Sequence, residues 1–175
     1  MIETARLIIR PWRDDDRAPF AAMGADPEVM QHLGPLMNRE ASDAAIDRMM
    51  ALQKAIGHCF WALEARDGGE FLGFCGLKMA PLGIHGLTGF PEIGWRLARR
   101  AWGQGFASEA AQASLDWGWQ MGMTRIVAMT VPANTRSQAV MQRIGMQRRP
   151  DLDFDHPLLA ADNPLRPHIA TEICR

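Results

Sequence analysis

Arg99-Arg-Ala-Trp-Gly-Gln-Gly-Phe-Ala-Ser-Glu-Ala-Ala-Gln-Ala-Ser-Leu-Asp-Trp-Gly-Trp-Gln120 joins an expected strand, residues 92–98, to a long expected helix. The connecting loop contains Gly103 and Gly105, and such a loop can turn several backbone N–H groups toward one anion. The helix behind it leaves its first N–H groups unpaired and adds a partial positive charge at the same place. The sequence therefore predicts a phosphate-binding loop.

The helix after this loop is suited to lie close against a sheet. Small residues recur on one of its sides at helical spacing, and polar residues occupy the other side. The small side consists of Ala107, Ala110, Ala111, Ser114 and Gly118, and the polar side of Glu109, Gln112, Asp116 and Gln120. We expect the small side to face the sheet and the polar side to face water.

Three familiar phosphate loops share these parts, and two of them do not fit. A nucleoside-triphosphate loop requires a Gly-Lys pair, which the chain lacks. A dinucleotide loop requires a third glycine, where this chain has Ser108, and an acidic residue in the next strand, where residues 125–131 have none. The pattern that remains is Arg100-x-x-Gly103-x-Gly105.

The composition is that of an ordinary globular protein. The 175 residues include 19 basic and 20 acidic side chains, so no net field attracts nucleic acid or a membrane. No apolar run approaches the ~20 residues of a membrane span, and Cys59, Cys75 and Cys174 have no metal-ligand spacing. We expect a single domain over residues 1–175, in the cytoplasm, with reduced cysteines, no metal, and neither nucleic acid nor membrane as a partner.

Periodicity and turn residues predict the order of the elements. Expected strands cover residues 5–10, 58–65, 70–79, 92–98, 124–131, 146–148 and 168–174. Expected helices start at residues 14–16 and end near 23, cover 26–31, run from Asn38 or Ser42 to residue 55, follow the glycine loop, and start at Asn134 or Thr135. An antiparallel meander followed by strand–helix–strand units gives a mixed α/β (α+β) sheet with helices on both faces.

The loop pattern resembles the pyrophosphate loop of the GNAT superfamily of N-acetyltransferases, which bind acetyl-coenzyme A. Other segments are similar to its branch of ribosomal-protein-alanine N-acetyltransferases. They are Thr4-Ala-Arg-Leu-Ile-Ile-Arg-Pro-Trp12, Glu92-Ile-Gly-Trp-Arg-Leu97, Pro132-Ala-Asn134-Thr-Arg-Ser137 with Ile144-Gly-Met146, and Phe154-Asp-His-Pro157. The resemblance spans most of the chain and implies the GNAT-like acyl-coenzyme A N-acyltransferase fold.

The resemblance also implies which residues bind the co-substrate, acetyl-coenzyme A. Backbone groups of Leu97 and Ala98 would pair with the pantetheine arm, and Asn134 and Ser137 would lie at its thioester end. The pyrophosphate loop would supply Arg100, Gly103, Gln104, Gly105, Phe106 and Ala107. Arg99 and Arg100 have an alternative reading as the solvated end of a strand.

The expected reaction is direct transfer of the acetyl group to a primary amine. Only a neutral amine attacks, and amine pKa values of about 8 to 10.4 require a base near neutral pH. Glu92 is the candidate base. An equally good interpretation is a glutamate at the strand edge that faces water or forms an ion pair with Arg96. Ser137 is the candidate proton donor, or else a plain helix N-terminal serine, because the chain has no tyrosine. The thiolate can also leave without an acid.

The acceptor is left open between a protein N-terminal amine and a small-molecule amine, and the assembly between a monomer and a homodimer. Residues 30–37, 83–90 and 150–167 are expected to face the acceptor, although residues 30–37 also read as methionine-rich core. His156 is a candidate for the same cleft, and Cys75 lacks a suitably spaced histidine for nucleophilic catalysis. The competing functions are a non-catalytic acyl-coenzyme A-binding or regulatory module and a nucleotide-binding protein.

Overall fold

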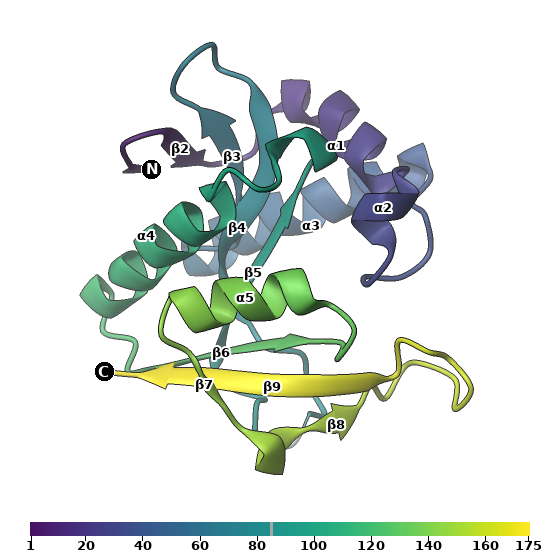
Figure 1. The fold of residues 1–175 in the computed structure, drawn as a ribbon. Coiled ribbons are helices and arrows are strands. Elements are labelled where there is room, and N and C mark those ends of the chain that lie inside the picture. The colour runs from purple at the N-terminus through teal and green to yellow at the C-terminus, as the bar shows by residue number, and fades with distance from the viewer. Residues whose placement is uncertain (85) are drawn as a thin grey trace.

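A computed structural model describes residues 1–84 and 86–175, which form a mixed sheet flanked by helices (Figure 1). The strand order is β1-β2-β3-β4-β5-β6-β9-β7, and β8 pairs with β9 beside this path. The strands are β1 (Ile2–Glu3), β2 (Leu7–Arg10), β3 (Phe60–Ala65), β4 (Phe71–Met79), β5 (Pro91–Leu97), β6 (Arg125–Thr130), β7 (Gln147–Arg148), β8 (Phe154–Asp155) and β9 (Pro167–Cys174). The expected mixed α/β sheet is confirmed.

Most of the expected helices form where their end signals lie. The helices are α1 (Arg17–Gly24), α2 (Pro27–Met30), α3 (Arg39–Ile56), α4 (Phe106–Gln120) and α5 (Thr135–Arg143), with short 3-10 turns η1 (Asp14–Asp16), η2 (Arg99–Ala101) and η3 (Pro150–Leu152). Of the two expected starts for α3, Asn38 is the N-cap, and its Oδ1 accepts a hydrogen bond from the Ala41 N–H at 2.8 Å. Gly57 ends this helix with φ +81°, in the left-handed region that glycine adopts readily.

The first five strands form an antiparallel meander, of which β2 to β5 match the expected strands. Asp67, Gly68 and Gly69 lie in the turn between β3 and β4, and β4 pairs with β5 along the whole length of β5. Because successive side chains of a strand point to opposite faces, Phe74 and Cys75 of β4 report which helices cover each face. Phe74 contacts Phe20 of α1, whereas Cys75 contacts Ser114 of α4. The helices α1 and α4 therefore cover opposite faces of the sheet.

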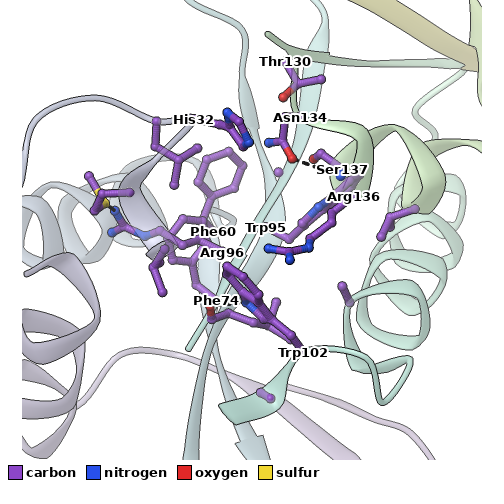
Figure 2. A pocket seen from close by; sticks show the side chains of 18 of the residues that line it. His32, Phe60, Phe74, Trp95, Arg96, Trp102, Thr130, Asn134, Arg136 and Ser137 are labelled. Atoms are coloured by element: carbon purple, nitrogen blue, oxygen red, sulfur yellow. Dashed lines mark hydrogen bonds between the residues drawn. The ribbon is translucent and has the colours of Figure 1, made fainter. Parts of the chain in front are cut away.

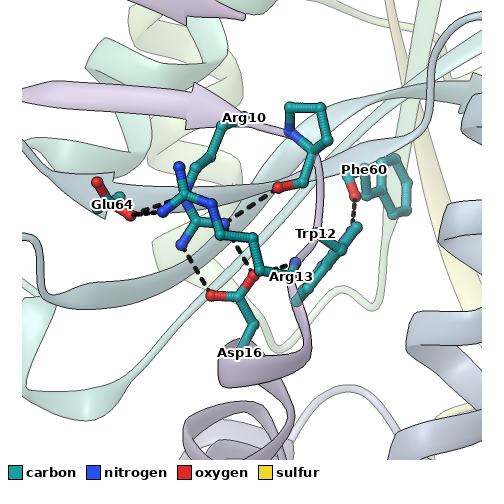
Figure 3. Close-up of polar contacts among 7 residues, drawn as sticks. Arg10, Trp12, Arg13, Asp16, Phe60 and Glu64 are labelled. Carbon is teal, nitrogen blue, oxygen red and sulfur yellow. Dashed lines mark hydrogen bonds and ion pairs between the residues drawn. The ribbon is translucent and has the colours of Figure 1, made fainter.

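A buried ion cluster fixes the corner between β2 and η1 (Figure 3). Both terminal nitrogens of Arg10 donate to the carboxylate of Asp16 at 2.8 Å, and Arg10 Nε donates to Glu64 of β3 at 2.6 Å. Arg10 is 4% exposed and Asp16 2%, so each charge depends on the other for its stabilisation. The corner carries Trp12, whose indole N–H donates to the backbone oxygen of Phe60 at 2.7 Å.

Two short strands depart from the sequence-based expectations. β1 was not expected, and the strand expected over residues 5–10 begins only at Leu7, because a turn from Thr4 to Leu7 precedes it. β8 lies inside a segment expected to be a polar tail, and its Phe154 pairs with His168 of β9. Each of these two strands has only two residues, which is too few for a periodic pattern. The equally short β7 was expected because it closely follows Gly145, the expected end of α5.

Candidate functional site

The candidate site begins where the parallel strands β5 and β6 separate. The two strands share one register pair, Glu92 with Val127, whereas β4 covers the other edge of β5 throughout. Figure 1 shows β5 and β6 running apart from this point. An open strand edge presents backbone N–H and C=O groups that an extended ligand can pair with.

A cavity of about 1000 Å³ opens at this divergence (Figure 2). Its walls come mainly from α2 and the segment after it, from β5, from the loop before α4, from the first turn of α4 and from the length of α5. The aromatic side chains of the lining are those of Trp12, Phe20, Phe60, Phe74, Trp95, Trp102 and Phe106. The lining is therefore largely apolar.

The glycine loop forms one end of the cavity. Gly103 and Gly105 have φ angles of +74° and +81°, which glycine adopts without strain, and both line the cavity together with Phe106 and Ala107. Gly105 is the N-cap of α4 and supplies no side-chain cap. The first amide groups of α4 are thus left for a ligand, at the positive end of the helix dipole. This geometry suits an anion.

A carboxylate in the first turn of α4 would repel such an anion, and the structure neutralises it. Glu109 was expected to face water, but it accepts hydrogen bonds from the Thr4 hydroxyl at 2.6 Å and from Arg6 Nε at 2.7 Å. Burial alone would raise the pKa of Glu109, yet these hydrogen bonds outweigh it and lower that pKa. Arg6 also donates to the backbone oxygen of Gln104 at 2.9 Å, which ties the loop to the N-terminal strands. The small side of α4 is buried as expected.

Three of the residues expected to bind the co-substrate lie outside the cavity lining. The Arg100 guanidinium donates to Glu70 at 2.5 Å and to the backbone oxygen of Phe71 at 2.6 Å. The Gln104 side chain donates to the Arg100 backbone oxygen at 2.9 Å, and the Ala98 N–H donates to Leu72 O. Their roles stay predictions, whereas Leu97 does line the cavity.

The start of α5 forms the opposite wall of the cavity. Asn134 is the N-cap of this helix, and its Oδ1 accepts a hydrogen bond from the Ser137 N–H at 3.2 Å (Figure 2). Both residues line the cavity, as the resemblance implies. The Ser137 hydroxyl makes no hydrogen bond to any residue that the structure describes, so it is available to a ligand.

Glu92, the candidate base, lines the cavity at the point where β5 leaves β6. Its Oε2 accepts a hydrogen bond from Lys78 Nζ at 2.5 Å, and its side chain is 14% exposed. Lys78 is the register partner of Glu92 on β4. The alternative that paired Glu92 with Arg96 is wrong, because the guanidinium of Arg96 lies instead between the rings of Phe20 and Phe74.

Two arginines contact the ring of Trp102, an arrangement that the sequence does not predict. The guanidinium of Arg136 lies 4.5 Å from the ring centroid of Trp102, and that of Arg99 lies 5.0 Å from it. Such contacts are attractive because the ring face is electron-rich. Trp102 and Arg136 line the cavity between the glycine loop and α5, and the only signal in the sequence is that Trp102 lies within the loop motif.

Of the three segments expected to face the acceptor, only one lines the cavity in the described part of the chain. Six members of residues 30–37 line the cavity, namely Met30, His32, Leu33, Gly34, Pro35 and Met37. Met30 is also buried and Met37 also packs against the core, so the role of this segment in binding an acceptor stays a prediction. The described part of residues 83–90 and all of residues 150–167 lie outside the lining, and residue 85 lies outside the described residues. His156 is therefore outside the cavity lining, and its ring centroid lies 5.3 Å from that of His168 in the C-terminal segment.

Other chemistries find little support among the described side chains. Cys75 is fully buried, and burial raises the pKa of its thiol to about 12, which suits a packed residue rather than a nucleophile. Across residues 1–84 and 86–175 there is no group of three or more His, Cys, Asp or Glu side chains arranged to hold a metal ion. Within the same residues, no helix has both the length and the apolar character needed to cross a membrane.

Comparison with protein families and curated proteins gives consistent matches. A family model described as an acetyltransferase (GNAT) domain matches residues 6–147. The uncharacterized protein YkkB of Bacillus subtilis (strain 168) is 35% identical over 145 residues, which cover 82% of this chain and 83% of that protein. The uncharacterized N-acetyltransferase p20 of Bacillus licheniformis is 30% identical over 148 residues, which cover 83% of this chain and 81% of that protein.

Solved structures share the whole arrangement of elements. A GNAT-family acetyltransferase from Bacillus anthracis has a TM-score of 0.81 at 26% identity, covering 99% of this chain and 97% of that chain. The ribosomal-protein-S5-alanine acetyltransferase from Vibrio fischeri has a TM-score of 0.74 at 16% identity, covering 98% of this chain and 94% of that chain. At the lower identity, the likeness concerns the fold.

Proposed function

This chain belongs to the GNAT acetyltransferase family and is an acetyltransferase, and we propose that residues 1–175 act as one domain that transfers acetyl from acetyl-coenzyme A directly to a primary amine. The observation that carries this proposal is one continuous cavity. It is lined by the glycine loop at one end, by the edge of β5 along its length, and by Glu92 at the far end of that strand. A co-substrate and an acceptor can therefore meet without any intervening chain.

Acetyl-coenzyme A binds with its diphosphate on the amides of the loop and of the first turn of α4. The uncapped N–H groups after Gly105 and the left-handed backbone of Gly103 support this assignment. The pantetheine arm, itself a chain of amides, pairs with the open edge of β5 between Leu97 and Glu92. The thioester then lies near the start of α5, beside Asn134 and Ser137.

Glu92 removes the proton that the attacking amine must lose. A carboxylate acting through water can do this near neutral pH for amines whose pKa lies at about 8 to 10.4. Lys78 occupies Oε2 and holds the side chain in one orientation, while Oε1 makes no hydrogen bond to a described residue. The leaving thiolate receives a proton or a hydrogen bond from the free hydroxyl of Ser137.

The acceptor is an amine on a protein N-terminus or on a small molecule. The ribosomal-protein-S5-alanine acetyltransferase shares the fold and supports the first, while the apolar lining of the cavity fits either. The chain acts as a monomer or a homodimer, in the cytoplasm.

Calorimetric titration with coenzyme A, followed by a thiol-release assay with acetyl-coenzyme A and a panel of amines, tests the proposal. We expect binding and amine-dependent release of coenzyme A. Binding without release for any amine would favour the alternative, a non-catalytic acyl-coenzyme A-binding module. Thermal stabilisation by ATP or NAD, with no effect of coenzyme A, would overturn the assignment of the loop.

A further inference from the structure

We propose that Arg96 binds a carboxylate carried by the acceptor, so that the enzyme prefers amines that bear an acidic group on an apolar skeleton. The inference rests on the proposed function, because it concerns the acceptor side of the same cavity. It is carried by a cationic side chain in the cavity wall that has no anionic partner among the described residues.

Arg96 lies on the face of β5 that turns toward α1. Side chains alternate along a strand, so Glu92 and Arg96 share this face, and Phe74 is the register partner of Arg96 on β4. The guanidinium carbon lies 4.8 Å from the ring centroid of Phe20 and 5.2 Å from that of Phe74. Figure 2 shows the Arg96 side chain extending from β5 away from Asn134 and Ser137. It therefore belongs to the part of the cavity opposite the expected thioester end.

No anionic side chain in the described part of the chain pairs with Arg96, whose charge is stabilised only by the faces of the Phe20 and Phe74 rings. Its Nη1 lies 3.0 Å from the sulfur of Met30 and 3.6 Å from that of Met37, and a thioether is only a weak acceptor. Its Nε is buried and has no hydrogen-bond partner. Burial lowers the pKa of Arg96 to about 10, so the group still carries its charge at neutral pH.

The acidic side chains of the same cavity are already engaged. Glu28 accepts a hydrogen bond from Arg99 at 2.9 Å, and Glu92 accepts one from Lys78. A partly buried cation without an anion is destabilising, and an anion supplied by a ligand would relieve that cost. The unpaired state of Arg96 is thus explained if the acceptor brings its own negative charge.

The surroundings of Arg96 favour a carboxylate on an apolar skeleton. A guanidinium offers a planar fork of donors that matches the two oxygens of a carboxylate. The rings of Phe20, Phe60 and Phe74 line the cavity beside it and suit an apolar body between the amine and the acid. The amine then points along β5 toward Glu92, and the acid remains at Arg96.

Matched pairs of amines test the inference. Phenylalanyl-alanine and aminohexanoic acid, which both separate the amine from the acid, are each compared with the corresponding amide, and kcat/KM is measured by release of coenzyme A. We expect at least one free acid to be preferred over its amide by about 10- to 100-fold, the effect of a charge-assisted hydrogen bond. Arg96→Gln should abolish the preference, and Arg96→Lys, which keeps the charge without the fork, should retain part of it.

Arg143→Gln is the matched control, because Arg143 is an exposed arginine in the lining of the same cavity. The ratio of kcat/KM for the acid to kcat/KM for the amide should be the same in this variant as in the wild type. If both glutamine variants lost the preference equally, the preference would come from the overall positive charge of the cavity, and the specific contact with Arg96 would be overturned. Thermal unfolding and coenzyme A titration verify that each variant is folded. A variant that is less stable but keeps the ratio gives Arg96 only a packing role and also overturns the inference.

Different results overturn the role of Arg96 and the proposed function. Turnover that is equal for acids and amides, better for amides, or absent for every acid while coenzyme A binds, overturns the role of Arg96. Absence of coenzyme A binding overturns the proposed function itself.

Discussion

Replacing Gly103 with alanine tests whether this glycine is required for the fold of the loop or for binding of a ligand to it. Gly103 has φ +74°, and no described atom lies within 4 Å of a Cβ built on it. Gly122, in the turn after α4, has φ +82° and equally open space, and it is not part of the cavity lining. The two substitutions impose similar backbone strain, but only Gly103→Ala adds a methyl group to the proposed diphosphate loop.

The expected magnitudes differ for stability and for binding. A left-handed backbone costs a non-glycine residue about 1–2 kcal/mol, partly offset by the lower entropy of the unfolded alanine chain. In a chain of this size, about 1 kcal/mol lowers Tm by about 2–4 °C, and both variants should show such a loss. Two lost hydrogen bonds to the charged diphosphate, at about 1.5 kcal/mol each, would weaken coenzyme A binding roughly 100-fold in Gly103→Ala alone.

Thermal unfolding and calorimetric titration with coenzyme A measure the two effects separately. We expect similar Tm values for the two variants and an affinity close to that of the wild type for Gly122→Ala. If both variants bound coenzyme A equally well, the diphosphate would not lie on this loop. If Gly103→Ala were far less stable than Gly122→Ala, its weaker binding would be a consequence of misfolding.

Glu92→Gln should lower kcat about 10²-fold and flatten the acid side of the pH–rate profile, and an unchanged profile removes Glu92 from the mechanism. Asp16→Ala leaves the guanidinium of Arg10 buried without its main partner, and denaturant unfolding should report a loss of about 3–5 kcal/mol. Burial lowers the pKa of His168, so the folded protein binds fewer protons than the unfolded chain just below pH 6.5. Stability should therefore fall as the pH is lowered from about 7 to about 5, and urea unfolding should find a smaller fall in His168→Gln. At about pH 8 a thiol reagent should modify Cys174 alone in the folded protein, because burial raises the pKa of the other two thiols to about 12.

Elements with strong local signals could be predicted from the sequence. The start of α3 follows from the side-chain cap at Asn38 and its end from Gly57, both of which act within one helical turn. The turn between β3 and β4 follows from Asp67, Gly68 and Gly69 for the same reason. The loop at Gly103 could be predicted for the same reason, because its two glycines and the small residues of the following helix are close together in the sequence.

Partners across the sheet could not be predicted, because register decides them. Pairing Glu92 with Arg96 assumed that a separation of four residues brings side chains together, which holds on a helix. On a strand the same separation spans about 13 Å at about 3.3 Å per residue. Lys78, far away in sequence, is the residue opposite Glu92 in the ladder. Arg100 similarly pairs with Glu70, a partner that no local pattern indicates.

One strand, β5, carries both proposed substrates because its edge and its face are free for different reasons. The edge is free because β6 leaves after the pair of Glu92 with Val127. The face is shaped at Gly94, where a Cβ would lie 2.6 Å from Cζ of the Phe60 ring, so a residue without a side chain lets the tip of that ring approach the strand. In the proposed function, the extended thioester lies on the edge of this strand and the amine on its face. This arrangement supports the proposed direct attack in a ternary complex, in which binding would hold the amine and the thioester in position to react.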